Sequence, residues 1–255
     1  MAGPDQLFEL RRIVTEDYRL VVPRAFLRVP HDAEERSRFL HRFFLERSGD
    51  AGRDATARSR RAAQERFEES YRRGRAAHVE EYFVLDLETD GVRATGSLLL
   101  AASPLDLSTR ERARAYTHRV AGRAGDGIGI RFIDLDSGGY AVAEVRKRIE
   151  EGVLDGADVA ALGREADAHL PADVRAERAS ARPKDRAAAD RQALTTCTLD
   201  LALPHPSGRR SVSLRLTTRD EALFSPLSTI VFSIAESLQF AAEDGWAGAF
   251  GAAAE

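Results

Sequence analysis

The alternation of hydrophobic and polar residues is most regular between residues 194 and 240. Two stretches place an aliphatic residue at every second position, and a turn with proline and glycine separates them, which predicts a β-hairpin. The aliphatic positions are Leu199, Leu201 and Leu203 in the first stretch, and Val212, Leu214 and Leu216 in the second. Since the inward positions are all aliphatic, this end of the chain is predicted to be a scaffold, with function elsewhere, on residues 31–80 or 151–190.

A strongly amphipathic helix is predicted directly after this hairpin. Its apolar residues follow the spacing i, i+3, i+4, i+7 and i+11, which is typical of a helix with one face on a core. They are Leu227, Ile230, Val231, Ile234 and Leu238. Ser225 is the predicted N-cap, with Pro226 at the first helical position, where its missing N–H is tolerated. The helix is expected to end near Phe240.

The spacing of apolar residues changes twice in the first third of the chain, from two short strands to an amphipathic helix and then to a highly charged helix. Residues 18–29 predict two short strands, interrupted at Pro23, which lacks the N–H for a ladder bond. Asp32 and Glu35 then form a capping box before a helix with phenylalanines on one face. Residues 55–79 are dense in arginine and glutamate and predict an exposed helix that contacts the body along a narrow apolar stripe.

The middle of the chain returns to a β pattern. Asp90–Gly91 is a strong turn signal between two alternating stretches, and residues 98–102 are apolar on both faces. A strand of that kind is predicted to be central and covered on both sides. A capping box at 108–111 then predicts a helix that ends at Gly122, followed by strands at 130–135 and 140–149.

This order of elements predicts an α+β fold, with a mainly antiparallel sheet and helices on both faces, that is, an α/β/α sandwich. Residues 1–255 are predicted to form a single domain with insertions. Residues 48–80 are interpreted as a charged helical elaboration and 242–255 as a tail. Residues 151–192 are interpreted as a polar, flexible insertion, because they carry too little apolar surface to offset the cost of ordering.

The charge composition bears on which kind of partner the chain can bind. Charged residues make up 31% of the 255 residues, yet the net charge is only −3, so basic and acidic side chains are mixed. This mixture favours solvated helices over a polyanion-binding face. The basic residues are nearly all arginine, with lysine only at Lys147 and Lys184, which a GC-rich genome explains more simply than a binding role.

The sequence also predicts a cytoplasmic protein without a membrane span. The first residues lack the apolar core of a secretory signal, and no run approaches the ~18 apolar residues that a membrane helix needs. Cys197 is the single cysteine, which excludes an intramolecular disulfide and any multi-cysteine metal site. Because it alternates with leucines, it is predicted to be a small buried residue.

No catalytic, cofactor or metal site is predicted from motifs. The six histidines include no two within four positions, so no local zinc motif forms. The acidic turn at 134–139 resembles a calcium loop, but Val145 stands where the bidentate glutamate belongs. The glycines at 125, 127 and 129 follow a helix and precede a strand, which is the reverse of a dinucleotide-binding turn. These observations disfavour an enzyme.

Several of these stretches together resemble a known superfamily. They are the strand YRLVVP, the hairpin FVLDLETDGVRATGSLLLAAS, the pair IRFIDLDSGGYAVAEV, and the closing SVSLRLTT and FSPLSTIVFSIAESLQF. The pattern is similar to the PsbP-like α/β/α sandwich superfamily, especially its actinobacterial members, which include LpqN-type lipoproteins and uncharacterised cytoplasmic proteins. The resemblance covers about two thirds of the chain. It implies a binding or assembly factor, with no shared catalytic residues.

Three functions remain open, of which a non-enzymatic protein-binding or assembly factor is favoured. Its candidate interaction surface is Arg60, Arg61, Arg66, Tyr71, Arg72 and Arg73. The second is a small-molecule-binding protein or enzyme, with a pocket lined by His118, Arg131, Asp134 and Tyr140. The third is an arginine-rich nucleic-acid module, which the interleaved glutamates disfavour. The identity of the protein partner and the oligomeric state stay open.

Overall fold

The computed structural model describes residues 9–48, 53–89, 92–151, 193–208, 210–242 and 245–248. The chain divides into two compact units. The first comprises residues 1–30, 70–148 and 195–255, and the second comprises residues 31–69 and 149–194. The predicted charged elaboration at 48–80 is thus divided between the two units, since residues 70–80 belong to the first.

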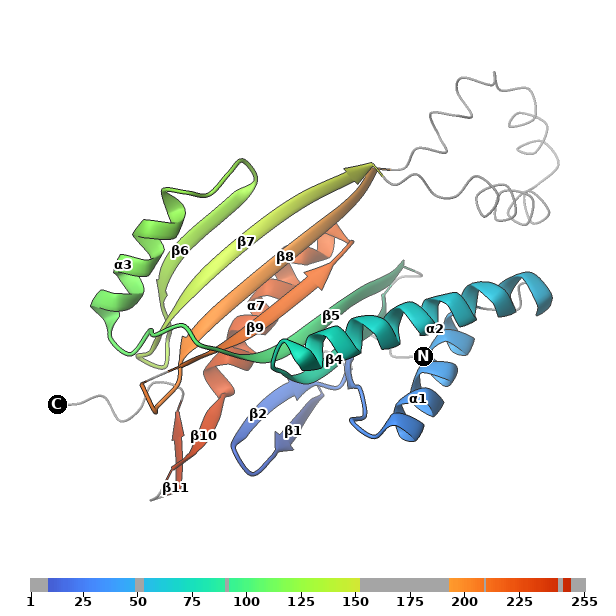
Figure 1. The fold of residues 1–255 in the computed structure, drawn as a ribbon, viewed down its shortest axis with the longest axis horizontal. Coiled ribbons are helices and arrows are strands. Elements are labelled where there is room, and N and C mark those ends of the chain that lie inside the picture. The colour runs from blue at the N-terminus through green and yellow to red at the C-terminus, as the bar shows by residue number, and fades with distance from the viewer. Residues whose placement is uncertain are drawn as a thin grey trace. The chain divides into compact units, whose positions relative to one another are not determined.

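A seven-stranded sheet forms the centre of the first unit (Figure 1). Its strands in spatial order are β3 (Phe26–Arg28), β4 (Val79–Thr89), β5 (Val92–Ser103), β9 (Ser211–Thr218), β8 (Ala193–Pro204), β7 (Tyr140–Glu151) and β6 (Ile128–Asp134). Neighbouring strands with a described register run antiparallel. Both predicted hairpins, β4–β5 and β8–β9, are present, and the predicted mainly antiparallel α+β class is confirmed.

One face of this sheet carries the main core under helix α7 (Glu221–Ser237). Leu98, Leu201 and Leu214 from three neighbouring strands are fully buried there, as is Val231 of the helix. The predicted apolar stripe of the helix is thus confirmed. Burial of a leucine or valine side chain contributes about 1.5–3 kcal/mol, so the packing of α7 on this face stabilises the fold.

The predicted start of this helix was wrong. Asp220 is the N-cap, and its side chain accepts a hydrogen bond from the N–H of Leu223 at 3.2 Å. Pro226 consequently lies inside the helix rather than at its first position. Asp220 follows β9 almost directly, so its carboxylate starts the helix before Ser225 is reached.

The end of the chain also differs from the prediction, because residues 239–242 leave the helix and form a strand. A second sheet has the order β1 (Leu10–Val14), β2 (Tyr18–Pro23), β10 (Gln239–Ala242) and β11 (Gly245–Gly248). Phe240 pairs with Tyr18. The predicted tail therefore begins with a strand, since β2 offers the backbone groups that a further helical turn would otherwise provide.

Helix α3 (Arg110–Ala121) covers part of the opposite face of the seven-stranded sheet. It buries Ala113 against Tyr140 and Val142 of β7, which alternate with the residues that face α7. Its N-cap is Thr109, one residue later than the predicted capping box, and it ends at Gly122 as predicted. Helices on both faces are therefore confirmed for this sheet.

The second unit contains helix α1 (Ala33–Ser48) and most of α2 (Arg53–Ala76). Asp32 caps α1 as predicted, since its Oδ1 accepts hydrogen bonds from the N–H groups of Glu34 and Glu35 at 3.0 and 2.8 Å. Arg36, 7% exposed, pairs with Glu68 at 3.1 Å and so joins α1 to α2. Apart from Glu151, the predicted insertion at 151–192 lies outside the described residues.

No helix in the described ranges is long and apolar enough to cross a bilayer.

Candidate functional site

Two of the predicted pocket residues, Asp134 and Tyr140, lie opposite each other where β6 ends and β7 begins, next to the turn that joins them. Arg110 of α3 connects them, because it forms an ion pair with Asp134 and its guanidinium lies 5.2 Å from the centre of the Tyr140 ring. Tyr140 is buried, stacks on Phe132 at 5.7 Å, and donates a hydrogen bond to the carbonyl oxygen of Leu107 at 2.7 Å. These contacts fix α3 on the sheet.

The other two predicted pocket residues, His118 and Arg131, do not join them. Arg131 pairs across the strands with Ala143, which belongs to the core under α7, so Arg131 lies on the opposite face of the sheet. His118 is exposed on α3. The four residues therefore line no common pocket, because strand alternation separates residues that are close in sequence.

The six residues of the predicted interaction surface all lie on α2. Tyr71 is only 5% exposed and packs on Tyr82 of β4, with 5.3 Å between ring centres. The backbone of Gly74 makes this contact possible, since a Cβ there would approach Cε2 of Tyr82 to 2.8 Å. Tyr71 is thus a packing residue of the first unit, while the five arginines remain on the helix surface or partly exposed.

A strip of the seven-stranded sheet between these two helices is left without a covering helix in the described part of the first unit. The last turns of α2 lie on β4 through Tyr82, and α3 lies on β6 and β7. Between them, Leu99 of β5 pairs with Tyr82 on one side and with Arg215 of β9 on the other. Leu99 is half-buried, and no helix in the described part of the first unit covers this face of β5, so its predicted covering on both faces stays a prediction.

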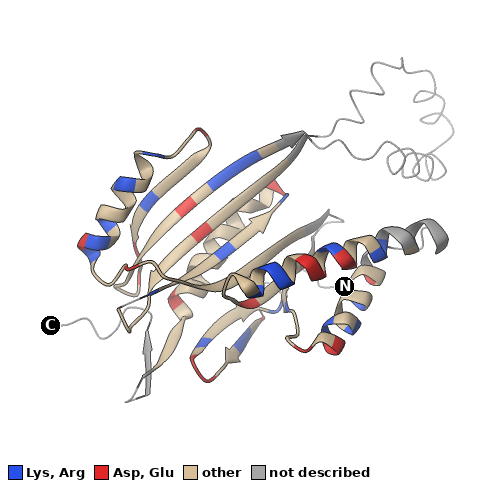
Figure 2. Cartoon of the chain, in the orientation of Figure 1, with Lys and Arg blue, Asp and Glu red and all other residues tan. Residues whose placement is uncertain are grey.

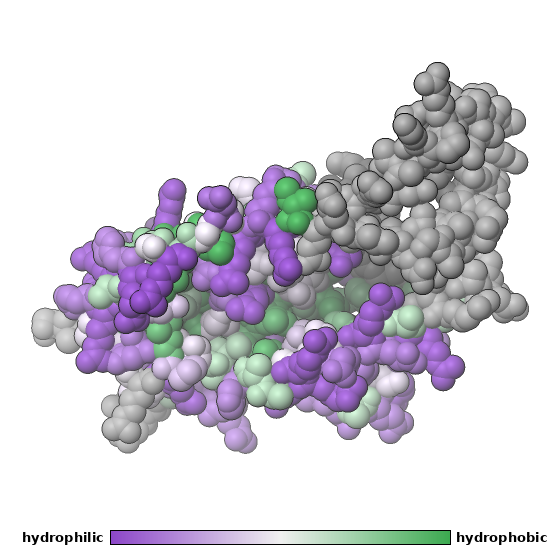
Figure 3. Space-filling view, turned by 45° about the horizontal axis from the view of Figure 1, so that its top comes forward, coloured by the Kyte–Doolittle hydropathy of each residue, from purple (hydrophilic) through white to green (hydrophobic). Residues whose placement is uncertain are grey.

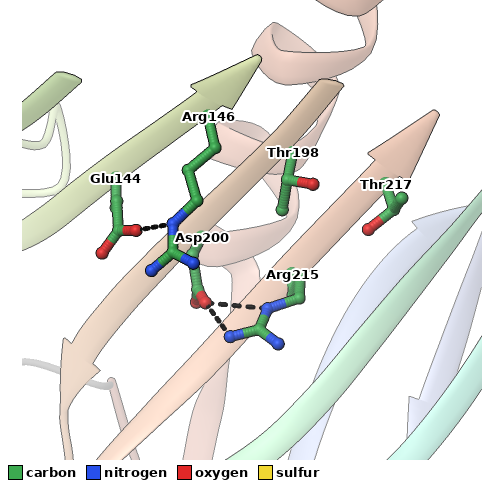
Figure 4. A pocket seen from close by; sticks show the side chains of 6 residues that line it. All are labelled: Glu144, Arg146, Thr198, Asp200, Arg215 and Thr217. Atoms are coloured by element: carbon green, nitrogen blue, oxygen red, sulfur yellow. Dashed lines mark hydrogen bonds and ion pairs between the residues drawn. The ribbon is translucent and has the colours of Figure 1, made fainter. Parts of the chain in front are cut away.

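A pocket of about 200 Å³ lies on this strip, which we call the open strip (Figure 4). Three neighbouring strands each contribute two lining residues. They are Glu144 and Arg146 from β7, Thr198 and Asp200 from β8, and Arg215 and Thr217 from β9. All six lie on the face opposite α7, because they alternate with core residues under α7, which are alanines in β7 and leucines in β8 and β9.

The charged groups of the pocket form a row across the three strands (Figure 4). Arg146 donates to Glu144 through Nε. Arg215 donates to Asp200 through Nε at 2.8 Å, and Ser213 donates to the other oxygen of that carboxylate. The hydrogen bond that Arg146 donates to Glu144 raises the pKa of Arg146, and the charges of Glu144 and nearby Asp200 add to this effect. Each of the two arginines is held in place by an ion pair with a carboxylate.

The carboxylates and the guanidinium groups of this row differ in exposure. The side chains of Glu144 and Asp200 are 18% and 22% exposed, whereas those of Arg146 and Arg215 are 57% and 51% exposed. The carboxylates thus lie at the base, against the sheet, and the guanidinium groups lie above them. The pocket consequently presents mainly hydrogen-bond donors to its surroundings.

The site offers little for catalysis. Its six lining residues include no histidine or cysteine, and both carboxylates already accept hydrogen bonds from arginine. Across the described ranges, no group of three or more His, Cys, Asp and Glu side chains is arranged to hold a metal ion. Cys197 is 3% exposed, as predicted, and burial raises the pKa of its thiol, which disfavours the reactive thiolate.

No family model, curated protein or solved structure matches this chain. Membership of the PsbP-like superfamily therefore stays a prediction. The sequence did contain one usable signal for the pocket, namely the polar outward positions of the last hairpin. Without the register of β7, β8 and β9, that signal does not show which charged side chains lie next to one another.

Proposed function

We propose that this chain is a non-enzymatic protein-binding protein and that its partner docks on the open strip as a helix. The supporting observation is a strip of sheet face that no helix covers in the described part of the first unit, with half-buried apolar residues such as Leu99 beside paired charges. The space-filling view shows apolar side chains at the bottom of a hollow with more hydrophilic rims (Figure 3). An amphipathic helix that packs on a sheet has an apolar side and polar flanks, which match an apolar floor with hydrophilic rims.

The width of the strip favours a helical partner. Five strand spacings separate β4, which carries the end of α2, from β6, which carries α3. At about 4.8 Å for each spacing, the two strands are about 24 Å apart. A helix with its side chains is about 10–12 Å across, so one further helix fits between the two that are present.

A small-molecule function is less well supported. Ligand pockets for small molecules usually measure about 300–1,000 Å³ and are mostly apolar. The pocket here has about 200 Å³, and four of its six lining side chains are charged. We therefore interpret it as the polar part of a docking surface.

A photo-crosslinking residue placed on the strip tests this function. The full chain carries p-benzoylphenylalanine at position 99, or, as a control, at position 10, where Leu10 is 63% exposed on a different sheet. After irradiation in a lysate of the source organism, we expect one discrete protein crosslinked at position 99 and not at position 10. Mass spectrometry should map the crosslink to a helix, and Leu99→Gln should abolish co-purification of that protein while Leu10→Gln preserves it.

Three results would contradict the proposal. They are the same crosslinks at both positions, crosslinks at position 99 to a second copy of this chain alone, and co-purification that survives Leu99→Gln.

A further inference from the structure

The charge of the open strip defines its partner further, on the premise that a helix docks there as proposed. In the described part of the chain, both Nη nitrogens of Arg146 and Nη1 of Arg215 make no hydrogen bond. These are the outward groups of the pocket, and the hydroxyl groups of Thr198 and Thr217 line it beside them. Groups of this kind are matched by an acceptor with two oxygens, such as a carboxylate.

The pocket alone is electrically neutral, since two arginines face two carboxylates. Its surroundings are not. Helix α3 contains four arginines and one glutamate, and two of these arginines, Arg110 and Arg112, form ion pairs with Asp134 and Asp106 outside the helix, which leaves a net charge of +1 for this group. Residues 70–76 at the end of α2 contain three arginines and no acidic residue. Figure 2 shows basic residues on both helices. Arginine therefore outnumbers acidic residues in both segments, whereas the whole chain has a net charge of −3.

Two arginines of α3 are held over aromatic rings. Arg114 lies 4.8 Å from the centre of the Phe132 ring, and Arg119 lies 5.6 Å from that of Tyr116. Stacking of this kind orders the guanidinium groups without neutralising them. The guanidinium groups of Arg114 and Arg119 are therefore held in fixed positions on α3.

We propose that the helix bound by the open strip is acidic, and that one of its carboxylates binds between Arg146 and Arg215. The apolar side of that helix contacts Leu99 and its neighbours, and acidic residues on its two flanks face α3 and the end of α2. A peptide helix is favoured over nucleic acid because the floor of the strip is partly apolar and carries no exposed aromatic residue among those described.

A peptide selection against the full-length protein tests this inference. The library displays 18-residue helices that share one apolar stripe, and glutamate, glutamine, lysine or alanine occupies the other positions. We expect enrichment of glutamate at one central position and on both flanks. Synthetic peptides from the selection should bind at least tenfold more weakly to Arg146→Gln/Arg215→Gln than to wild type, and more weakly at 300 mM than at 50 mM salt.

Arg131→Gln is the matched control, because Arg131 is exposed on the opposite face of the same sheet. It should leave the affinity unchanged, and thermal melting should confirm that every variant is folded. Inorganic phosphate at millimolar concentration is added to show whether a free anion displaces the peptide.

The outcomes separate the inference from the proposed function. Neutral or basic peptides that require Leu99 but not Arg146 would overturn the acidic partner and leave helix docking in place. Failure of any peptide to enrich above an unrelated control protein would overturn both. Displacement by phosphate together with equal binding of glutamate and glutamine peptides would identify a small-anion site and also contradict the proposal.

Discussion

The buried carboxylate of Glu81 should contribute strongly to stability, because it joins both sheets of the first unit. Glu81 is 1% exposed. Its two oxygens accept a hydrogen bond from Oη of Tyr18 in β2 at 2.9 Å and from Nε of Arg28 in β3 at 2.7 Å, and Nη2 of Arg28 forms a further contact. Tyr18 belongs to the four-stranded sheet, and Arg28 and Glu81 belong to the seven-stranded sheet.

Glu81→Gln preserves the shape of the side chain but replaces one acceptor oxygen with an N–H₂ group that faces other donors. Hydrogen bonds to a charged group contribute about 1.5–3 kcal/mol each. Because Arg28 is 36% exposed, water can compensate its part of the loss. We therefore expect the free energy of unfolding to fall by about 2–3 kcal/mol, which lowers Tm by about 4–12 °C for a chain of this size.

Differential scanning calorimetry and urea unfolding at neutral pH measure this change. Glu34→Gln is the matched control, since the side chain of Glu34 is 84% exposed and lies 3.9 Å from Arg38. Such a surface pair contributes little, so the control should stay within about 0.5 kcal/mol of wild type. If Glu81→Gln melts together with Glu34→Gln, the buried carboxylate does not hold the two sheets together, and the reasoning fails.

Two further predictions concern the sheet and the response to high pH. Gly96→Ala should lower the free energy of unfolding by about 1–3 kcal/mol, because its Cβ would lie 2.8 Å from the carbonyl oxygen of Thr217. A Cβ at Gly129 would have no atom within 4 Å, so Gly129→Ala is the control and should change the free energy little. Urea unfolding measures both variants. Burial first, and the charge of Glu81 second, raise the pKa of Tyr18 in the folded chain. The resulting stability is present below the unfolded pKa of about 10 and is lost as pH rises above it. Tyr18→Phe should therefore lose stability less steeply than wild type between pH 9 and 11.5, and equal slopes would contradict this.

Much of the fold follows from local chemistry. The helix stripe at 227–238 was predictable because its spacing leaves one apolar face that must be buried. Asp32 was predictable as a cap because a short side-chain acceptor beside free N–H groups needs no distant partner. The hairpins were predictable because alternation and turn residues are adjacent in sequence.

The start of the last helix was not predictable in the same way. The prediction placed the cap at Ser225, with Pro226 at the first helical position, whereas the structure has it at Asp220, five residues earlier. Where the helix begins depends on where β9 ends, and that end is set by pairing with β5 and β8. This tertiary pairing, which local capping preferences do not include, therefore fixed the start of the helix.

By itself, the sequence determined which residues must be buried, because the burial of apolar side chains depends on a periodicity that is written along the chain. The open strip and its pocket were decided only by the tertiary structure. Arg146, Asp200 and Arg215 come from three strands, and their meeting depends on strand order and register, which no local pattern encodes. Within the described part of the first unit, the strip of β5 left between α3 and the end of α2 likewise results from where these two helices pack. An apolar residue such as Leu99 looks the same in sequence whether or not a helix covers it.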